Sequence, residues 1–411
     1  MTEGMPSVRS VSLGYWIGTG SRGEDDAQAG LSHLIEHLLF KGTARYESLE
    51  IDQIFDGMGA ELNAGTGKET TSVYSRVIDE HFDLAFDVMS DMVFRPRFDD
   101  IDSEREVILE EIAMYEDDPQ DKVFDVLGEA VFGDHPLGRS IIGSSEVVAR
   151  TPVDGIRAFH DSRYVASNVV IAAAGAVDHE ALVELARTRV PNGGRSADAP
   201  TPQPAPSVLT PRVLFERKDT EQYHVCLGGP GIPRDDDRRY ALRVLDTLFG
   251  GTSSSRLFQE VREKRGLAYS VYSFTGQFSD TGQIGLYVGT RSDNLAPALE
   301  VVARELERLQ REPGTADELL RAKENLKGRV VLSLESTGSR MNRLGSAVLS
   351  GMPLLSLDEI VARIDAVSLD DLAEMASELF DPAKLSTGGI GPDEDLFRAA
   401  LGPLAPQPVG A

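Results

Sequence analysis

The sequence predicts an α+β protein of two similar domains, each a mostly antiparallel sheet with helices packed on one face. Three observations lead to this fold class: the length, a proline-rich segment near the middle, and a short motif that occurs twice. The chain has 411 residues, of which 41% are hydrophobic and 26% are charged. That composition is typical of a globular protein, and that length accommodates two domains of ordinary size.

The boundary between the domains is predicted from a segment without hydrophobic periodicity. Residues 191–211 read PNGGRSADAPTPQPAPSVLTP, a composition that cannot form a core. We therefore predict a linker over 191–211, between an N-terminal domain over 1–190 and a C-terminal domain over 212–411.

The similarity of the two domains is predicted from an internal repeat. Residues 39–43 (LFKGT) match residues 248–252 (LFGGT), and each copy closes a hydrophobic helix and precedes a long helical run. Three polar residues of the first copy then stand opposite mostly hydrophobic ones in the second: His33, Glu36 and His37 opposite Leu242, Leu245 and Asp246. Only the first half is expected to carry chemistry.

The individual elements are predicted from periodicity. Alternation of hydrophobic and polar residues indicates strands at 8–17, 70–77, 169–177, 213–215, 224–227, 269–274 and 283–288. Hydrophobic residues at i, i+3 and i+4 indicate helices at 81–93, 103–115, 236–249, 296–310 and 316–332. The strands are grouped between helices without strict alternation, which favours α+β domains.

Charge and patterning exclude several classes of partner. The formal net charge is −26, whereas nucleic acids and anionic membranes require basic surface, so neither is expected to bind. The single Cys226 cannot form an intrachain disulfide, and no hydrophobic stretch approaches 18 residues. With no secretory signal pattern in residues 1–30, we expect a cytoplasmic protein without membrane spans.

The candidate site begins with the segment 30–40, GLSHLIEHLLF. Ser32 is a plausible N-cap, and Leu34, Ile35, Leu38 and Leu39 would form the hydrophobic face of a helix. His33 and His37, four residues apart, would then lie on one side with Cβ atoms roughly 5–6 Å apart, close enough to bind one metal ion. The alternative is that these histidines only share a surface or core face by chance.

Glu36 lies beside the two histidines. It is one residue before His37 and three after His33, so it can reach a water at the metal without being a ligand itself. Zinc lowers the pKa of such a water to about 7, and a neighbouring carboxylate can take its proton during attack on an amide.

A third zinc ligand is predicted on an acidic helix. Residues 99–118 contain ten carboxylates and one base, which ordinarily indicates a solvated helix face. Glu104 and Glu111 are seven residues apart and share one side of that helix. Glu111 could complete a His-His-Glu set while Glu104 orients a ligand or the base. Glu110, about 100° round the helix, is the competing candidate.

These motifs resemble one enzyme family. HLIEH, LFKGT, ELNAGTGKET and EREVILEEIAMYEDDP are similar to segments of the pitrilysin-type inverzincins, and most of all to mitochondrial processing peptidase and its bacterial relatives. The resemblance covers essentially the whole chain. It implies a zinc endopeptidase acting on peptides or unfolded polypeptides, with one Zn²⁺ per chain. It assigns zinc binding to His33, His37 and Glu111, the general base to Glu36 and an auxiliary role to Glu104.

The resemblance also implies substrate-binding residues. Phe40 matches a position that lines a pocket just after the scissile bond, although ordinary helix core is an equal interpretation. Residues 61–66 (ELNAGT) resemble the edge strand that pairs with an extended substrate, with Asn63 and Ala64 at the matching places. Arg262 and Tyr269, within VREKRGLAY, resemble a pair that holds substrate from the opposite domain.

The family builds its chamber from four domains, and this chain supplies two. The resemblance therefore implies a homodimer that forms a closed chamber, or a heterodimer with a related chain. Alternatives to an endopeptidase are a non-catalytic partner subunit of such an assembly and a zinc hydrolase of non-peptide amides. The family also has a strand ahead of residues 7–19; either this chain starts late or its sheet lacks an edge strand.

Overall fold

A computed structural model describes residues 1–191 and 200–404, so residues 192–199 of the predicted linker lie outside the described part. The described residues form two compact units. The first comprises 1–113, 139–203 and 331–354, and the second comprises 114–138, 204–330 and the described part of 355–411. This division differs from the predicted domains in two segments, 114–138 and 331–354, each of which belongs with the other half of the chain.

The sheet of the first unit has five strands in the order β1-β5-β2-β4-β3. In that order they are Thr2–Gly4, Val169–Gly175, Ser10–Ile17, Thr71–Ile78 and Glu61–Thr66. All neighbours are antiparallel except β1 and β5, which are parallel. The short strand β1 precedes β2 in sequence and occupies one edge, so this sheet has an edge strand there after all.

The sheet of the second unit repeats this topology in the order β6-β10-β7-β9-β8. In that order its strands are Val213–Arg217, Ser386–Gly391, Gln222–Gly231, Gly282–Arg291 and Ser270–Gln277. Its only parallel pair, β6 with β10, corresponds to β1 with β5. Since strand order and direction agree position by position, the predicted α+β fold of two similar, mostly antiparallel domains is confirmed.

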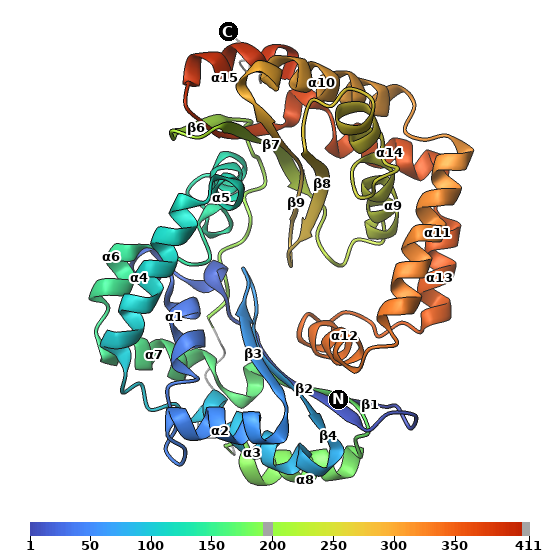
Figure 1. The fold of residues 1–411 in the computed structure, drawn as a ribbon. Coiled ribbons are helices and arrows are strands. Elements are labelled where there is room, and N and C mark those ends of the chain that lie inside the picture. The colour runs from blue at the N-terminus through green and yellow to red at the C-terminus, as the bar shows by residue number, and fades with distance from the viewer. Residues whose placement is uncertain (192–199, 405–411) are drawn as a thin grey trace. The chain divides into compact units, whose positions relative to one another are not determined.

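Helices cover one face of the first sheet (Figure 1). The helices of this half are α1 (Leu31–Leu38), α2 (Ser48–Met58), α3 (Phe82–Phe94), α4 (Ile101–Asp117), α6 (Ser145–Arg150), α7 (Val153–Arg163) and α8 (His179–Arg189). The opposite face takes α12 (Thr337–Leu349), where Trp16 packs against Met341 and Leu344. The buried strand β2 is therefore covered on both faces, beyond the single helical face predicted.

The second unit follows the same plan. Its helices are α9 (Arg239–Phe249), α10 (Leu295–Arg311), α11 (Ala316–Ser333), α13 (Leu357–Ala366), α14 (Leu369–Leu379) and α15 (Glu394–Leu401). The opposite sheet face takes α5 (Pro119–Phe132), whose Leu127 packs with Cys226 and Tyr287. The two segments that differ from the predicted domains therefore contain α5 and α12, the helices that cover the second faces.

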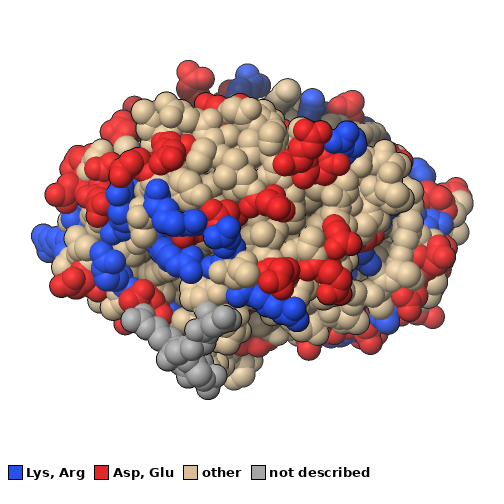
Figure 2. Space-filling model, turned by 90° about the horizontal axis from the view of Figure 1, so that it is seen from below, with Lys and Arg blue, Asp and Glu red and all other residues tan. Residues whose placement is uncertain are grey.

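Acidic and basic side chains are interspersed on the face shown in Figure 2. Ion pairs also occur within the first unit; Arg97 lies 2.5 Å from a carboxylate oxygen of Glu47 and 3.0 Å from one of Asp99. Among the described residues, no helix is long and hydrophobic enough to cross a membrane.

Candidate metal centre

The helix α1 begins in a way that the sequence did not predict. Its N-cap is Gly30, with φ of 102°, and not Ser32. The buried carboxylate of Glu24 accepts hydrogen bonds from the backbone N–H groups of Gly30 (2.8 Å) and Ser32 (2.7 Å). Burial raises the pKa of Glu24, and these two hydrogen bonds oppose the shift. The side chain of Glu24, six residues before the N-cap, thus accepts hydrogen bonds from N–H groups that a capping side chain would otherwise satisfy.

The hydrophobic face of α1 fixes the direction of its polar side. Leu34, Ile35 and Leu38 are fully buried in the first core, as the spacing predicted. The imidazoles of His33 and His37 then lie together on the other side, with ring centroids 4.7 Å apart.

Helix α4 supplies a third donor. His33 Nε2 lies 3.7 Å from Glu111 Oε1, and His37 Nε2 lies 3.4 Å from Glu111 Oε2. The ligand atoms of these three residues all lie within 4.8 Å of one another, and within the described residues this is the one such group. Glu110 is exposed and outside the group. Two imidazole nitrogens and a carboxylate are a donor set used by catalytic zinc, so the residues present fit that ion.

Glu104 contacts the Nδ1 side of His37. It is 3% exposed, and its Oε1 lies 2.8 Å from His37 Nδ1 while its Oε2 accepts from Lys41 Nζ at 2.7 Å. Burial alone would raise the pKa of Glu104, but the hydrogen bonds from Lys41 and His37 outweigh it and the pKa is lowered. An ionised Glu104 therefore keeps the Nδ1 proton of His37 and leaves Nε2 free for a metal.

The surroundings of His33 change its pKa. Burial, followed by the charge of His37, lowers the pKa of His33 to about 4. His33 is consequently neutral at physiological pH, the form in which imidazole binds metals. Its buried Nδ1 has no hydrogen-bond partner among the described residues.

Glu36 lies on the same helix as both histidines. Burial raises its pKa, and its interactions with Thr66 on β3 oppose that shift. Its Oε2 is buried without a hydrogen-bond partner among the described residues. A partly desolvated carboxylate with one free oxygen beside the donor set has the position and the raised pKa suited to a general base.

The other residues predicted for the first unit lie near this helix. Phe40 is partly buried against the first core. Asn63 and Ala64 lie on the edge strand β3, which pairs with β4, and the Asn63 side chain accepts from Ala64 N at 2.8 Å. Among the described strands, none pairs with the other edge of β3.

The two residues predicted in the second unit contact each other. The guanidinium of Arg262 lies 4.6 Å from the ring centre of Tyr269, and Tyr269 is 78% exposed. Arg262 belongs to a π-helical turn, Phe258–Glu263, a feature that often occurs at functional sites.

Sequence reasoning missed two residues that contact α1 or its histidines. Lys41 was overlooked although it stands four residues after His37, within the repeated LFKGT motif just past the end of α1. Glu24 gave no signal, because its contact with the start of α1 arises from the path of the intervening loop.

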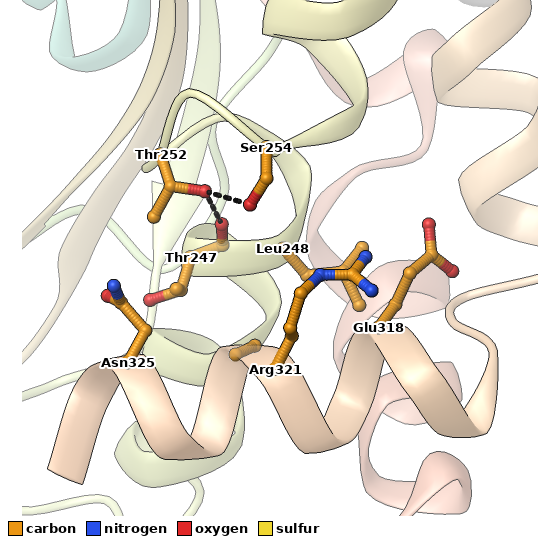
Figure 3. Close-up of a pocket in the computed structure, with 8 residues that line it drawn as sticks. Thr247, Leu248, Thr252, Ser254, Glu318, Arg321 and Asn325 are labelled. Atoms are coloured by element: carbon orange, nitrogen blue, oxygen red, sulfur yellow. Dashed lines mark hydrogen bonds between the residues drawn. The ribbon is translucent and has the colours of Figure 1, made fainter. Parts of the chain in front are cut away.

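At the matching place in the second unit, the described residues form no such group of donors. On α9, Leu242 and Leu245 are buried in the core, and Asp246 accepts a hydrogen bond from Ser273 Oγ at 2.6 Å. A cavity of about 150 Å³ beside α9 is lined by the hydroxyl-bearing Thr247, Thr252 and Ser254 and by residues of α11 (Figure 3). Its one carboxylate, Glu318, is paired with Arg256 at 2.7 Å.

Fold and site together define a duplicated α+β protein with a His-His-Glu group in its first half. Comparison with known proteins identifies the family: the chain belongs to peptidase family M16. Residues 1–145 match the model described as insulinase (peptidase family M16), and residues 152–326 match that of the peptidase M16 inactive domain. The predicted resemblance is thereby confirmed.

Individual relatives also support this family. A protein of Streptomyces coelicolor, called an uncharacterized zinc protease, is 44% identical over 98% of this chain and 89% of its own. The zinc protease YmxG of Bacillus subtilis, also called uncharacterized, is 40% identical over 92% of each chain.

Two solved structures share the fold. One is described as a protease from Helicobacter pylori, with a TM-score of 0.88, 22% identity, and coverage of 95% of this chain and 96% of that one. The other is a peptidase M16 inactive domain from Pseudomonas fluorescens, with a TM-score of 0.87, 23% identity and 95% of each chain covered.

Proposed function

We propose that this protein is a zinc-dependent endopeptidase that cleaves peptides or unfolded polypeptide segments. The observation that carries the proposal is the group formed by His33, His37 and Glu111, with Glu36 on the same helix as the histidines. Relatives called zinc proteases, at 40% identity or more, support a peptidase of this kind.

His33, His37 and Glu111 would hold one zinc ion per chain, with His33 neutral and His37 kept in the required tautomer by Glu104. When bound, the zinc supplies Lewis acidity that activates water and polarises the scissile carbonyl. Three protein ligands leave a position open for water and substrate.

Glu36 would move the proton. Its carboxylate takes a proton from the attacking water, and the resulting acid can give that proton to the departing amine nitrogen. Its raised pKa reduces the cost of the protonated state between these two steps. Its free, buried Oε2 is the oxygen suited to this transfer.

Substrate would bind in extended form along β3, whose open edge offers backbone hydrogen bonds beside Asn63 and Ala64. Phe40 would line a pocket for a substrate side chain near the metal group. Arg262 and Tyr269 would contact the substrate through the face formed by their stacked side chains. Two copies of the chain, or this chain and a related one, would enclose the substrate.

The test combines metal analysis with cleavage of an unfolded protein and of short peptides. We expect one zinc per wild-type chain, and loss of cleavage on chelation that zinc restores.

Glu36→Gln should keep the zinc and the fold but lose about 10²–10⁴-fold in turnover, because an amide cannot accept the proton. Glu110→Gln, an exposed change of the same kind, should behave as wild type. If Glu36→Gln keeps more than about a tenth of wild-type turnover at full zinc occupancy, Glu36 is not the base. Zinc binding without cleavage would favour a non-catalytic subunit.

A further inference from the structure

A cavity of about 370 Å³ lies within the second unit, where β9 ends and α10 begins. Its polar lining consists of Gln222, Arg262, Tyr269, Thr290, Arg291 and Asn294. None of the described residues that line it carries a carboxylate, although the chain has a formal charge of −26. Two arginines facing one cavity without acidic neighbours in its wall favour an anionic group as its occupant.

Arg291 has unused hydrogen-bonding capacity. It is the last residue of β9 and stands opposite Gln222, the first residue of β7. Its guanidinium forms no hydrogen bond or ion pair with another described residue. By contrast, Arg238 and Arg256 in the same unit have carboxylate oxygens at 2.6 Å and 2.7 Å. A free guanidinium offers a fork of N–H donors that matches a carboxylate.

Arg262 is already held in place. Its guanidinium lies over the rings of Phe258 (4.7 Å) and Tyr269 (4.6 Å), so cation–π contacts restrict its orientation. The ion pair found for it is with its neighbour in sequence, Glu263, at 3.7 Å, which is too long for a hydrogen bond. The charge of Arg262 can therefore add to that of Arg291.

The wall between the arginines is fixed by hydrogen bonds. Thr290 Oγ1 and Asn294 Nδ2 donate to the carbonyl of Leu267, at 2.6 Å and 3.2 Å. Asn294 is also the N-cap of α10, a helix of 17 residues with no acidic residue in its first turn. The first turn of α10 therefore places no carboxylate at the positive end of this helix dipole, and the nearest one in sequence is Asp293, just before the N-cap.

We propose that this cavity binds a carboxylate of a peptide, with Arg291 as its principal partner and Arg262 as a second positive charge. A peptide is favoured because Tyr269 directly precedes β8, an edge strand of the second sheet that, within the described residues, pairs with β9 alone. A chain extended along that edge would bring an acidic side chain or its C-terminal carboxylate to the cavity. The choice of a peptide rests on the proposed function.

The test uses the full chain carrying Glu36→Gln, so that peptides remain intact, and measures affinity by titration calorimetry. Three peptides share one sequence: a neutral amidated form with Gln, an amidated form with Glu in its place, and the Gln form with a free C-terminus. We expect one acidic form to bind about tenfold more tightly than the neutral form. Tighter binding of the Glu form would identify a side-chain carboxylate, and tighter binding of the form with a free C-terminus would identify the terminal carboxylate. Adding Arg291→Gln should remove this preference while affinity for the neutral form stays unchanged.

Two further variants separate charge recognition from folding. Arg311→Gln makes the same change on the exposed end of α10, away from the cavity, and should leave the preference intact. Arg291→Glu should reverse the preference towards a peptide with Lys. The proposal is overturned if Arg291→Gln retains the preference, if it weakens all three peptides equally, or if no acidic form binds better than the neutral one. If the wild type cleaves peptides but binds acidic and neutral forms equally, only the carboxylate site is contradicted. If acidic peptides bind more tightly but the wild type cleaves none, only the peptidase proposal is contradicted.

Discussion

Replacing Glu104 by Gln tests whether the residue behind His37 controls the metal centre. Glu104 is 3% exposed, and its two oxygens face different donors, His37 Nδ1 at 2.8 Å and Lys41 Nζ at 2.7 Å. An amide has one oxygen, so one of these donors must face an NH₂ group. Each hydrogen bond to a charged group is worth about 1.5–3 kcal/mol, and loss of such support for a ligand typically lowers metal affinity roughly 10–100-fold. We expect a loss of affinity in that range.

The assay is zinc competition with a chromophoric chelator, alongside thermal unfolding. Glu106→Gln is the matched control, since Glu106 is an exposed glutamate on the same helix. The pKa of Glu104 is lower in the folded protein than in the unfolded chain, so the ionised carboxylate stabilises the folded state. This contribution to the free energy of unfolding is present at pH values above the unfolded-state pKa, and it is lost as the pH falls through the folded-state pKa. If Glu104→Gln binds zinc as tightly as Glu106→Gln, Glu104 does not position His37.

Two other predictions concern the third ligand and the assembly. Glu111→Gln should lose zinc while Glu110→Gln keeps it, as measured by metal content after dialysis; the reverse pattern would assign the ligand to Glu110. Inactive Glu36→Gln and Arg262→Ala chains, mixed under conditions of subunit exchange, should regain activity if a homodimer builds each site from two chains. If exchange is demonstrated and the mixture stays inactive, a separately encoded partner is the better explanation.

The donor set could be read from sequence because it depends on local geometry. His33 and His37 share a side of one helix through their spacing, and Glu104 and Glu111 do the same on another. What brings the two helices together is tertiary packing, which local spacing does not encode. The family resemblance selected Glu111 over Glu110, and the observed geometry places Glu111 with the histidines.

Other features could not be predicted because their signal is non-local. Strand β10 reads STGGIG, and its glycines conceal the alternation that marks a strand, although all six residues are buried. The sequence also does not show that α5 belongs to the second unit and α12 to the first. An amphipathic pattern shows which side of a helix is hydrophobic but not which sheet that side covers. A linker at 191–211 therefore indicated two halves but not the membership of those helices.

The expected stoichiometry of one zinc per chain follows from how the second half is packed. The positions matching His33 and Glu36 are Leu242 and Leu245, which are 1% and 0% exposed within the second core. Polar side chains placed there would lose contact with water without a partner, at a cost of about 1–3 kcal/mol each. The third position is Asp246, whose carboxylate is already bonded to Ser273. The second half can keep the strand order of the first without a His-His-Glu group, because α9, its counterpart of α1, contributes leucines to the core where α1 presents histidines.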